Sequence, residues 1–140
     1  MKASVLYRIA SALLLLFAAG HTVGFLRLEP PTAEAAVVRD GMMKVRFPVG
    51  GTESSYWGFY VGFGLFVTAY LLFSAVLAWQ LGSLAGTSPG AVARLGWAFF
   101  GVQLATLILS WIYFPAPPVV FSALVAACAG WAAWLVSAAA

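Results

Sequence analysis

Four long runs of apolar residues dominate the chain, and each is long enough to cross a membrane as a helix. They cover about residues 5–26, 57–81, 92–114 and 119–138. A membrane-spanning helix needs about 20 mostly apolar residues, which each run provides. Backbone polar groups in hydrocarbon have to be satisfied within their own segment, so these runs are predicted to be helices. None of them alternates with a period of two, which disfavours strands.

The two shorter connections have the composition of turns. "GSLAGTSPG" (82–90) is rich in glycine and serine, and Ser88 can cap the following helix with Pro89 at its first position. "PAPP" (115–118) ends the third helix and precedes the fourth. We therefore expect an all-α membrane protein, with residues 1–140 forming a single domain of four transmembrane helices.

The long connection, residues 27–56, is predicted to contain a short amphipathic helix in the membrane interface. Pro30-Pro31 ends the first span, and Thr32 can cap the stretch "AEAAVVRDGMMKVRF" that begins at residue 33. Its apolar residues recur at spacings of three and four, which favours a helix over about 33–46: Ala35, Val38, Met42 and Val45. "FPVGG" (47–51) then predicts a turn or a re-entrant elbow.

Composition narrows the classes of protein. Sixty-four per cent of the residues are apolar and eight per cent are charged, too few charges to cover a soluble domain. The net charge of +3 gives no argument for a nucleic-acid partner. One cysteine excludes an internal disulfide, and one histidine leaves a zinc site without enough ligands. No metal site is predicted, and the cofactor stays open.

The N-terminus resembles a secretion signal, with Lys2 and Arg8 before an apolar run and small residues near 18–20. We expect it to remain as an uncleaved anchor. The charges that flank the first helix, Lys2 and Arg8 against Arg27, favour both termini inside. Lysine and arginine counted over all loops slightly favour the opposite orientation, which stays open.

Two pairs of glycines are spaced four apart at the loop-side ends of the first two helices. They are Gly20 with Gly24, and Gly58 with Gly62. Small residues at this spacing let helix backbones approach closely, since lipid gives helices no hydrophobic drive to associate. The matched depth of the pairs predicts that the two helices cross closely there.

His21, the single histidine, lies in "GHTVG" near the end of the first apolar run. A polar side chain in a span faces the bundle or a wet cavity, so we expect His21 to point inward. One interpretation is structural: the ring hydrogen-bonds a group between residues 53 and 60, with Tyr60 among the candidates. The other is functional: Glu53 pairs with His21 as a general acid–base dyad, with Tyr60 assisting, or the ring binds a ligand.

The third helix carries three polar residues spaced three and four apart, Gln103, Thr106 and Ser110. We expect this stripe to face the interior of the bundle. Two interpretations of the stripe are open. Its side chains form hydrogen bonds between helices, or they are the polar lining of a ligand cavity shared with His21 and Tyr60.

The first half of the chain resembles a known family. "GHTVG" (20–24), "FPVGG" (47–51) and "FYVGFG" (59–64) are similar to motifs of a family of small, uncharacterised bacterial membrane proteins with four helices. The general shape also resembles that of DoxX-type proteins. The resemblance implies a four-helix fold in the bacterial inner membrane, and it implies no activity.

Two functions follow as hypotheses. The first is a non-enzymatic membrane protein, either an accessory subunit of a larger membrane complex or a binder of a lipophilic molecule. The second is a small enzyme that uses His21 and Glu53 on a lipid or quinone-like substrate. The expected partners are membrane lipids, other membrane subunits or a lipophilic ligand. The sequence carries no phosphate-binding loop, dinucleotide fingerprint or hydrolase motif.

Overall fold

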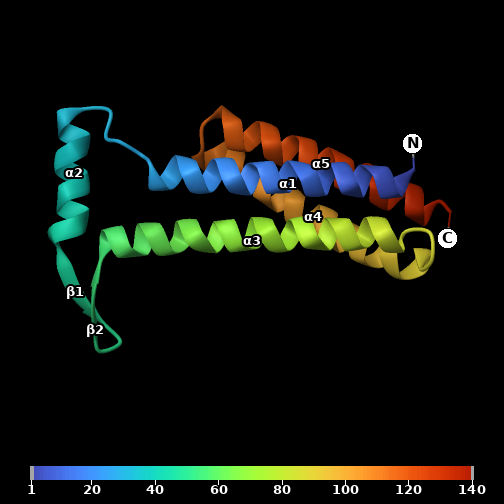
Figure 1. The fold of residues 1–140 in the computed structure, drawn as a ribbon, viewed down its shortest axis with the longest axis horizontal. Helices are drawn as coiled ribbons and strands as arrows, with labels where there is room; N and C mark the ends of the chain where they lie inside the picture. Colours follow the sequence, from blue (N-terminus) through green and yellow to red (C-terminus); the bar gives the residue numbers. More distant parts are fainter. Residues whose placement is uncertain (1, 140) are drawn as a thin grey trace. The chain divides into compact units, whose positions relative to one another are not determined.

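The computed structural model describes residues 2–139 and confirms the four predicted spans (Figure 1). They are α1 (Ala3–Leu26), α3 (Tyr56–Leu84), α4 (Pro89–Tyr113) and α5 (Ala116–Ser137). Each is long and apolar enough to cross a membrane. A short helix, α2 (Ala33–Lys44), lies between the first two spans. The protein is therefore an all-α, multi-pass membrane bundle.

The helix ends differ from the predicted ones mainly at prolines. We expected α5 to begin at residue 119, but it begins at Ala116, with Pro117 and Pro118 in its first turn. The first turn tolerates proline because its backbone N–H groups have no partner within the helix. Ser88 occupies the N-cap position of α4, but its side chain makes no capping hydrogen bond.

The chain divides into two compact units. One unit comprises the described residues up to Phe17 and from Leu71 onward, and the other comprises Ala18–Tyr70. The helices α1 and α3 each contribute one stretch to each unit.

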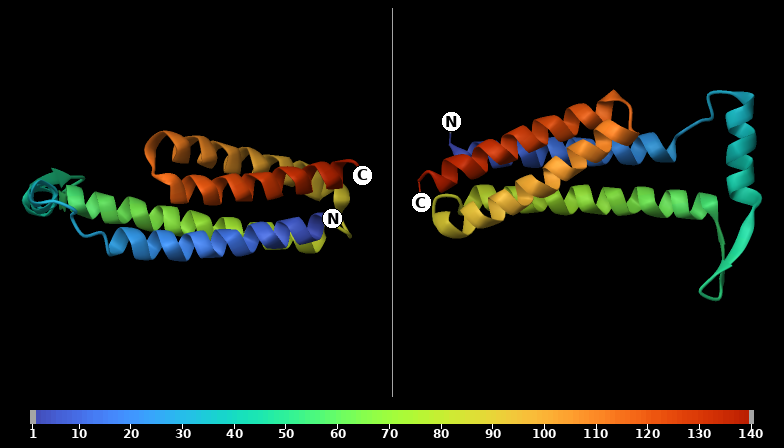
Figure 2. Two further views of the ribbon diagram at one scale, coloured as in Figure 1. Left: turned by 90° about the horizontal axis from the view of Figure 1, so that it is seen from above. Right: turned by 180° about the vertical axis from the view of Figure 1, so that it is seen from behind.

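The first unit is built on small residues. Alanine is the commonest residue among its buried apolar positions, whereas several large apolar side chains, such as Phe73 and Trp131, are exposed. This is the pattern expected where lipid surrounds the helices and close backbone packing holds them together. The helices α4 and α5 run alongside each other in both views of Figure 2. Gly96 leaves room for the ring of Tyr7, and Gly130 leaves room for Phe100.

Polar side chains in the first unit join its helices by hydrogen bonds. The Ser11 hydroxyl donates to the carbonyl oxygen of Ala75 at 2.8 Å. The Trp97 indole donates to the Ser137 hydroxyl at 3.0 Å. The guanidinium of Arg8 lies 5.2 Å from the centre of the Trp79 ring, a cation–π contact.

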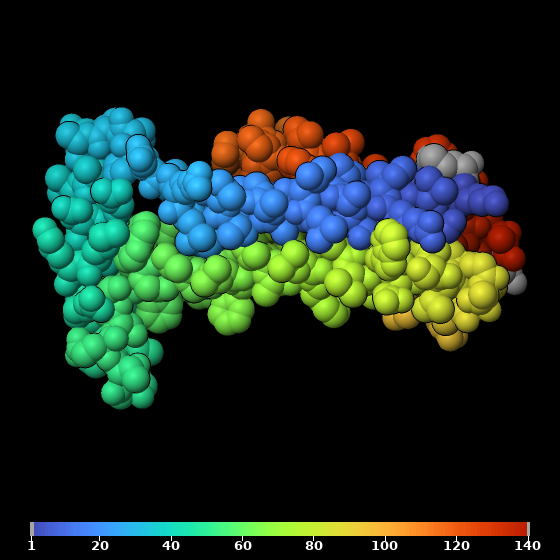
Figure 3. Space-filling view, in the orientation of Figure 1, coloured from blue at the N-terminus to red at the C-terminus, as the bar shows by residue number. Residues whose placement is uncertain are grey.

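In the second unit, α2 lies crosswise at the ends of α1 and α3 (Figures 1 and 3). The Thr32 hydroxyl accepts a hydrogen bond from the Ala35 amide at 3.2 Å, which confirms the predicted cap. Hydrogen bonds from its own backbone amide and from Thr32 hold the pKa of Glu34 below its usual value.

The apolar stripe predicted for α2 is partly wrong. Val38 and Val45 are exposed, and the half-buried face instead follows Ala35, Arg39 and Met42. The spacing of four and three between these residues is equally helical, and the long stem of arginine can cover apolar surface. The periodicity predicted the helix and placed Ala35 and Met42 correctly on its inner face, but Arg39 lies there in place of Val38.

Residues 46–55 form a β-hairpin and not a re-entrant elbow. Strand β1 (Arg46–Val49) pairs antiparallel with β2 (Thr52–Ser55), with Arg46 opposite Ser55. Gly50 and Gly51 make the two-residue turn with φ of +57° and +85°. Tight hairpin turns need positive φ at both central residues, which glycine adopts without strain.

Candidate functional site

His21 is held by a backbone group of α3. Its Nε2 lies 3.0 Å from the carbonyl oxygen of Gly64, and since a carbonyl only accepts, Nε2 carries the proton. His21 is half-buried, as expected for a side chain that faces a neighbouring helix. The predicted hydrogen bond is present, but its partner is none of the candidates between Glu53 and Tyr60.

The same glycine accommodates Phe25, one helical turn after His21. A Cβ atom at Gly64 would lie 2.6 Å from Cε2 of the Phe25 ring. That ring packs against His21, with centroids 5.0 Å apart, and meets the edge of Tyr60 at 6.2 Å. Tyr60 in turn stacks on Trp57 at 5.1 Å. Tyr60 is therefore part of an aromatic cluster that joins α1 to α3.

Two threonines add a polar contact between α1 and α3, with Thr68 one turn after Gly64 on α3. The hydroxyls of Thr22 and Thr68 lie 2.8 Å apart. Thr22 is also within hydrogen-bond distance of the Ala18 carbonyl, and Thr68 of the Gly64 carbonyl. The two hydroxyls have two protons for three contacts, so a hydrogen bond between the helices forms when one hydroxyl donates to the other instead of to its own helix.

The close approach predicted at the two glycine pairs is wrong. A Cβ atom at Gly20, Gly24 or Gly62 would have no atom within 4 Å. At Gly58 the nearest atom is the hydroxyl oxygen of Ser55, at 3.4 Å, and this oxygen caps α3 by accepting from the Gly58 amide. Within this unit α1 and α3 meet closely at Gly64 instead.

Gly58 and Gly62 contribute to an open groove where the hairpin meets α3. The groove has a volume of about 480 Å³. We call it the hairpin groove, and its lining combines one face of α3 with the adjacent hairpin residues: Arg46, Glu53, Ser54, Ser55, Gly58, Phe59, Gly62, Phe63 and Phe66. Figure 3 shows the hairpin projecting past the side of α3.

The apolar part of the hairpin groove is made by three phenylalanines around the two glycines. Phe59, Phe63 and Phe66 are 40%, 64% and 75% exposed, so their rings are available to a ligand. Phe47 of the hairpin stacks on Phe59, with centroids 5.8 Å apart and nearly parallel planes. An isolated two-stranded hairpin is marginally stable, so this contact helps to hold the hairpin in place.

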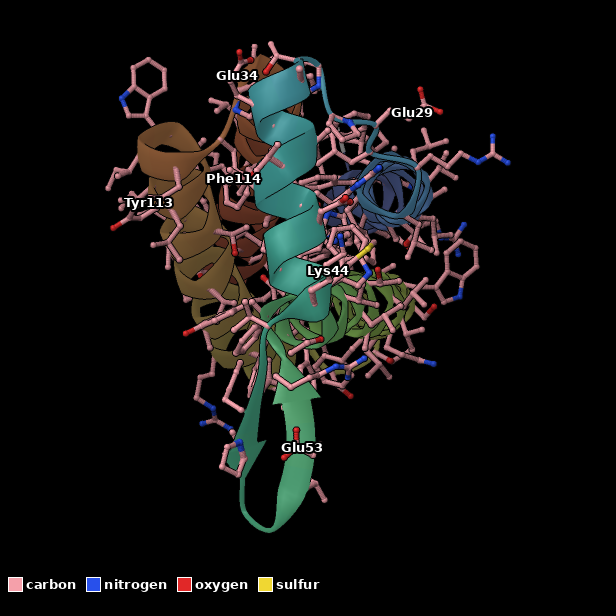
Figure 4. The ribbon with its side chains drawn as sticks, turned by 90° about the vertical axis from the view of Figure 1, so that its left-hand side faces the viewer. Glu29, Glu34, Lys44, Glu53, Tyr113 and Phe114 are labelled. Atoms are coloured by element: carbon pink, nitrogen blue, oxygen red, sulfur yellow. The ribbon has the colours of Figure 1, made fainter. Side chains whose placement is uncertain are left out.

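The polar end of the hairpin groove carries two opposite charges. Arg46 begins β1 and Glu53 lies in β2, opposite Pro48. Among residues 2–139 the only ion pair joins Asp40 to Lys44 on the surface of α2, at 3.7 Å. Figure 4 shows Glu53 on the hairpin, well apart from Glu34 on α2. Arg46 and Glu53 therefore both face the groove without an ionic partner.

The polar stripe of α4 belongs to the first unit and does not line the hairpin groove. Gln103 and Ser110 are buried, which confirms that they face the interior. Ser110 and Ser122 lie within hydrogen-bond distance of each other, 3.2 Å, and join α4 to α5. Thr106 is half-buried and donates to the carbonyl of Val102. The Ser110–Ser122 contact fits the interpretation of this stripe as hydrogen bonding between helices.

The His21–Glu53 dyad is not assembled. His21 bonds Gly64, and Glu53 is an exposed side chain of the hairpin groove. Within residues 2–139 no cluster of three or more potential ligand side chains could hold a metal ion.

Sequence reasoning did not name four large side chains of the hairpin groove as site residues: Arg46, Phe59, Phe63 and Phe66. A signal for the phenylalanines was present, because positions 59, 63 and 66 follow the glycines at 58 and 62 with helical spacing. That spacing places them on one face of α3. Comparisons of this chain with protein-family models, curated proteins and solved structures give no match.

Proposed function

We propose that this protein binds a lipophilic molecule in the hairpin groove. The proposal rests on an open groove that is lined by two glycines and three exposed phenylalanines and carries charged residues at one end. Its volume of about 480 Å³ falls within the range of about 300–1,000 Å³ typical of small-molecule sites. On the resemblance of "GHTVG" and "FYVGFG", we place the protein in the bacterial inner membrane. The charges that flank the first helix, Lys2 and Arg8 against Arg27, favour both termini inside.

The position of the hairpin groove along α3 supports a ligand drawn from the membrane. Its lining follows α3 from Gly58 to Phe66, within the first three turns of an apolar span. At 1.5 Å per residue this stretch covers about 12 Å. A molecule with a polar head and an apolar tail would place its head at the hairpin and its tail along α3.

A second candidate function is that of an accessory subunit, with a helix of a partner protein seated on Gly58 and Gly62. Gly62 is open and Gly58 has only the Ser55 hydroxyl nearby, and glycines at this spacing favour close helix packing. The enzymatic hypothesis has less support, because the two side chains it requires are apart. His21 is hydrogen-bonded to Gly64, whereas Glu53 is exposed in the hairpin groove.

The hairpin groove can be filled by a single substitution. Gly62→Leu adds a side chain where no atom lies within 4 Å, so the variant is expected to fold. Gly20→Leu is the matched control, since Gly20 is equally open but lies on α1 outside the groove. Native mass spectrometry of protein released from mild detergent should show a bound lipophilic molecule on wild type and on Gly20→Leu. Gly62→Leu should carry markedly less, and equal loading of all three proteins would refute the proposal.

A further inference from the structure

We infer that the hairpin groove selects a zwitterionic phospholipid whose head group carries a primary amine. This inference rests on the proposed function, and it names the chemical class of the ligand. It follows from the two opposite charges at one end of the groove and the apolar face of α3 beyond them.

The charges at the polar end match a phosphate and an ammonium group in one molecule. A guanidinium donates two parallel hydrogen bonds to phosphate oxygens, which suits Arg46 for the phosphate. A carboxylate accepts hydrogen bonds from a primary ammonium, which suits Glu53 for the amine. A trimethylated amine has no N–H donor and would lose these hydrogen bonds.

A lipid with a single net charge is matched less well. The phosphate of an anionic lipid such as phosphatidylglycerol would be attracted by Arg46 and repelled by Glu53. The head group of a cationic amphiphile would be attracted by Glu53 and repelled by Arg46. Both side chains lack an ionic partner within residues 2–139, so only a head group of both signs neutralises both.

The depth of the hairpin groove fits the same molecule. The charged residues belong to the hairpin, outside the span, whereas Gly62, Phe63 and Phe66 lie within α3. An acyl chain on the two glycines would lie between exposed phenylalanine rings. In a bilayer any open groove on a span is in contact with acyl chains, so a lipid reaches it without a dedicated partner. A lipid is therefore favoured over the helix of another protein.

Head-group preference tests the inference. Purified protein in detergent is titrated with short-chain phosphatidylethanolamine, phosphatidylcholine and phosphatidylglycerol, and bound lipid is counted by native mass spectrometry. Wild type should bind phosphatidylethanolamine about tenfold more tightly than either other lipid, the fold-change that one charge-assisted hydrogen bond corresponds to. Glu53→Gln should bind phosphatidylethanolamine and phosphatidylcholine equally, and Arg46→Gln should bind all three lipids more weakly.

The control variants change charges of α2 that do not line the groove, Glu34→Gln and Lys44→Gln. Both should keep the wild-type preference. Equal binding of the three lipids to wild type, with binding still lost in Gly62→Leu, would overturn the head-group inference and leave the proposed function standing. Binding unaffected by Gly62→Leu would overturn both, as would cross-linking that finds a helix of a second protein on Gly58 and Gly62.

Discussion

The imidazole of His21 donates from Nε2 to the carbonyl oxygen of Gly64, 3.0 Å away on α3. The missing side chain of the same glycine makes room for the ring of Phe25, which packs on His21. One position of α3 therefore holds both a polar and an aromatic contact from α1. His21 lies outside the hairpin groove, which assigns it to joining helices rather than to the proposed ligand site.

Replacing His21 should reduce stability without affecting lipid binding. His21→Leu removes the donor to Gly64 and should lower the free energy of unfolding by about 0.5–1.5 kcal/mol, the usual net value of one hydrogen bond. His21→Gln keeps an N–H donor and should lose less. Thermal unfolding in detergent measures the first effect, and native mass spectrometry measures bound lipid. Loss of bound lipid in a folded His21→Gln protein would show that the ring has a functional role.

Gly64→Ala should destabilise the second unit, because the new Cβ would overlap the Phe25 ring. Overpacking of this kind costs about 1–3 kcal/mol. Gly20→Ala is the matched control, since its Cβ meets no atom and alanine favours a helix over glycine by about 1 kcal/mol. Denaturant unfolding should rank Gly20→Ala above wild type and Gly64→Ala below it.

A second substitution distinguishes the source of this effect. Phe25→Ala removes the ring, so adding Gly64→Ala to it should cause no further loss. An additive double variant would contradict the proposed overlap.

The threonine pair should show energetic coupling. Thr22→Val and Thr68→Val each remove one hydroxyl of the 2.8 Å contact and keep the shape of the side chain. Hydrogen bonds between membrane helices average about 0.6 kcal/mol by double-mutant cycles. We expect a coupling energy of about that size from the unfolding of the two single variants and the double variant. The absence of any coupling would mean that each hydroxyl bonds only its own helix.

The start of α2 should be sensitive to acid. Its hydrogen bonds lower the pKa of Glu34 in the folded state, so their contribution is present above the ordinary glutamate pKa. This contribution is lost as the pH falls through the folded pKa. Hydrogen-exchange protection of α2 amides should therefore fall in wild type as the pH is lowered below about 5, in the range where carboxyl groups protonate.

Two variants separate the parts of this cap. Glu34→Gln cannot ionise, so protection of its α2 amides should vary less with pH over the same range. Thr32→Ala removes the hydroxyl that accepts from Ala35 and should weaken α2 at every pH, by about 1 kcal/mol. An identical pH profile for wild type and Glu34→Gln would contradict the assignment.

Much of the fold could be predicted because it depends on local composition. The four spans and the Thr32 cap follow from apolar run length and from one side chain that accepts a backbone proton. The hairpin was harder to predict, since four-residue strands show little alternation. Gly50-Gly51 was a sufficient signal for its turn.

The candidate site could not be predicted to the same extent. Glycines spaced four apart allow a close crossing or an open groove, and the sequence does not say which side chain approaches them. In α3 the ring of Phe25 meets Gly64, while Gly62 stays open. Whether Glu53 reaches His21 likewise depended on the direction of the hairpin, which is set by Phe47 stacking on Phe59.

Photo-cross-linking in a bilayer shows whether a phospholipid occupies the hairpin groove. The protein is reconstituted with phosphatidylethanolamine that carries a diazirine in its acyl chain, and labelled residues are mapped by mass spectrometry. We expect the labels to concentrate on Phe59, Phe63 and Phe66, and we expect Gly62→Leu to reduce them while Gly20→Leu does not. Labels spread evenly over exposed residues of other spans, such as Leu16 and Trp131, and unchanged in Gly62→Leu would contradict this expectation.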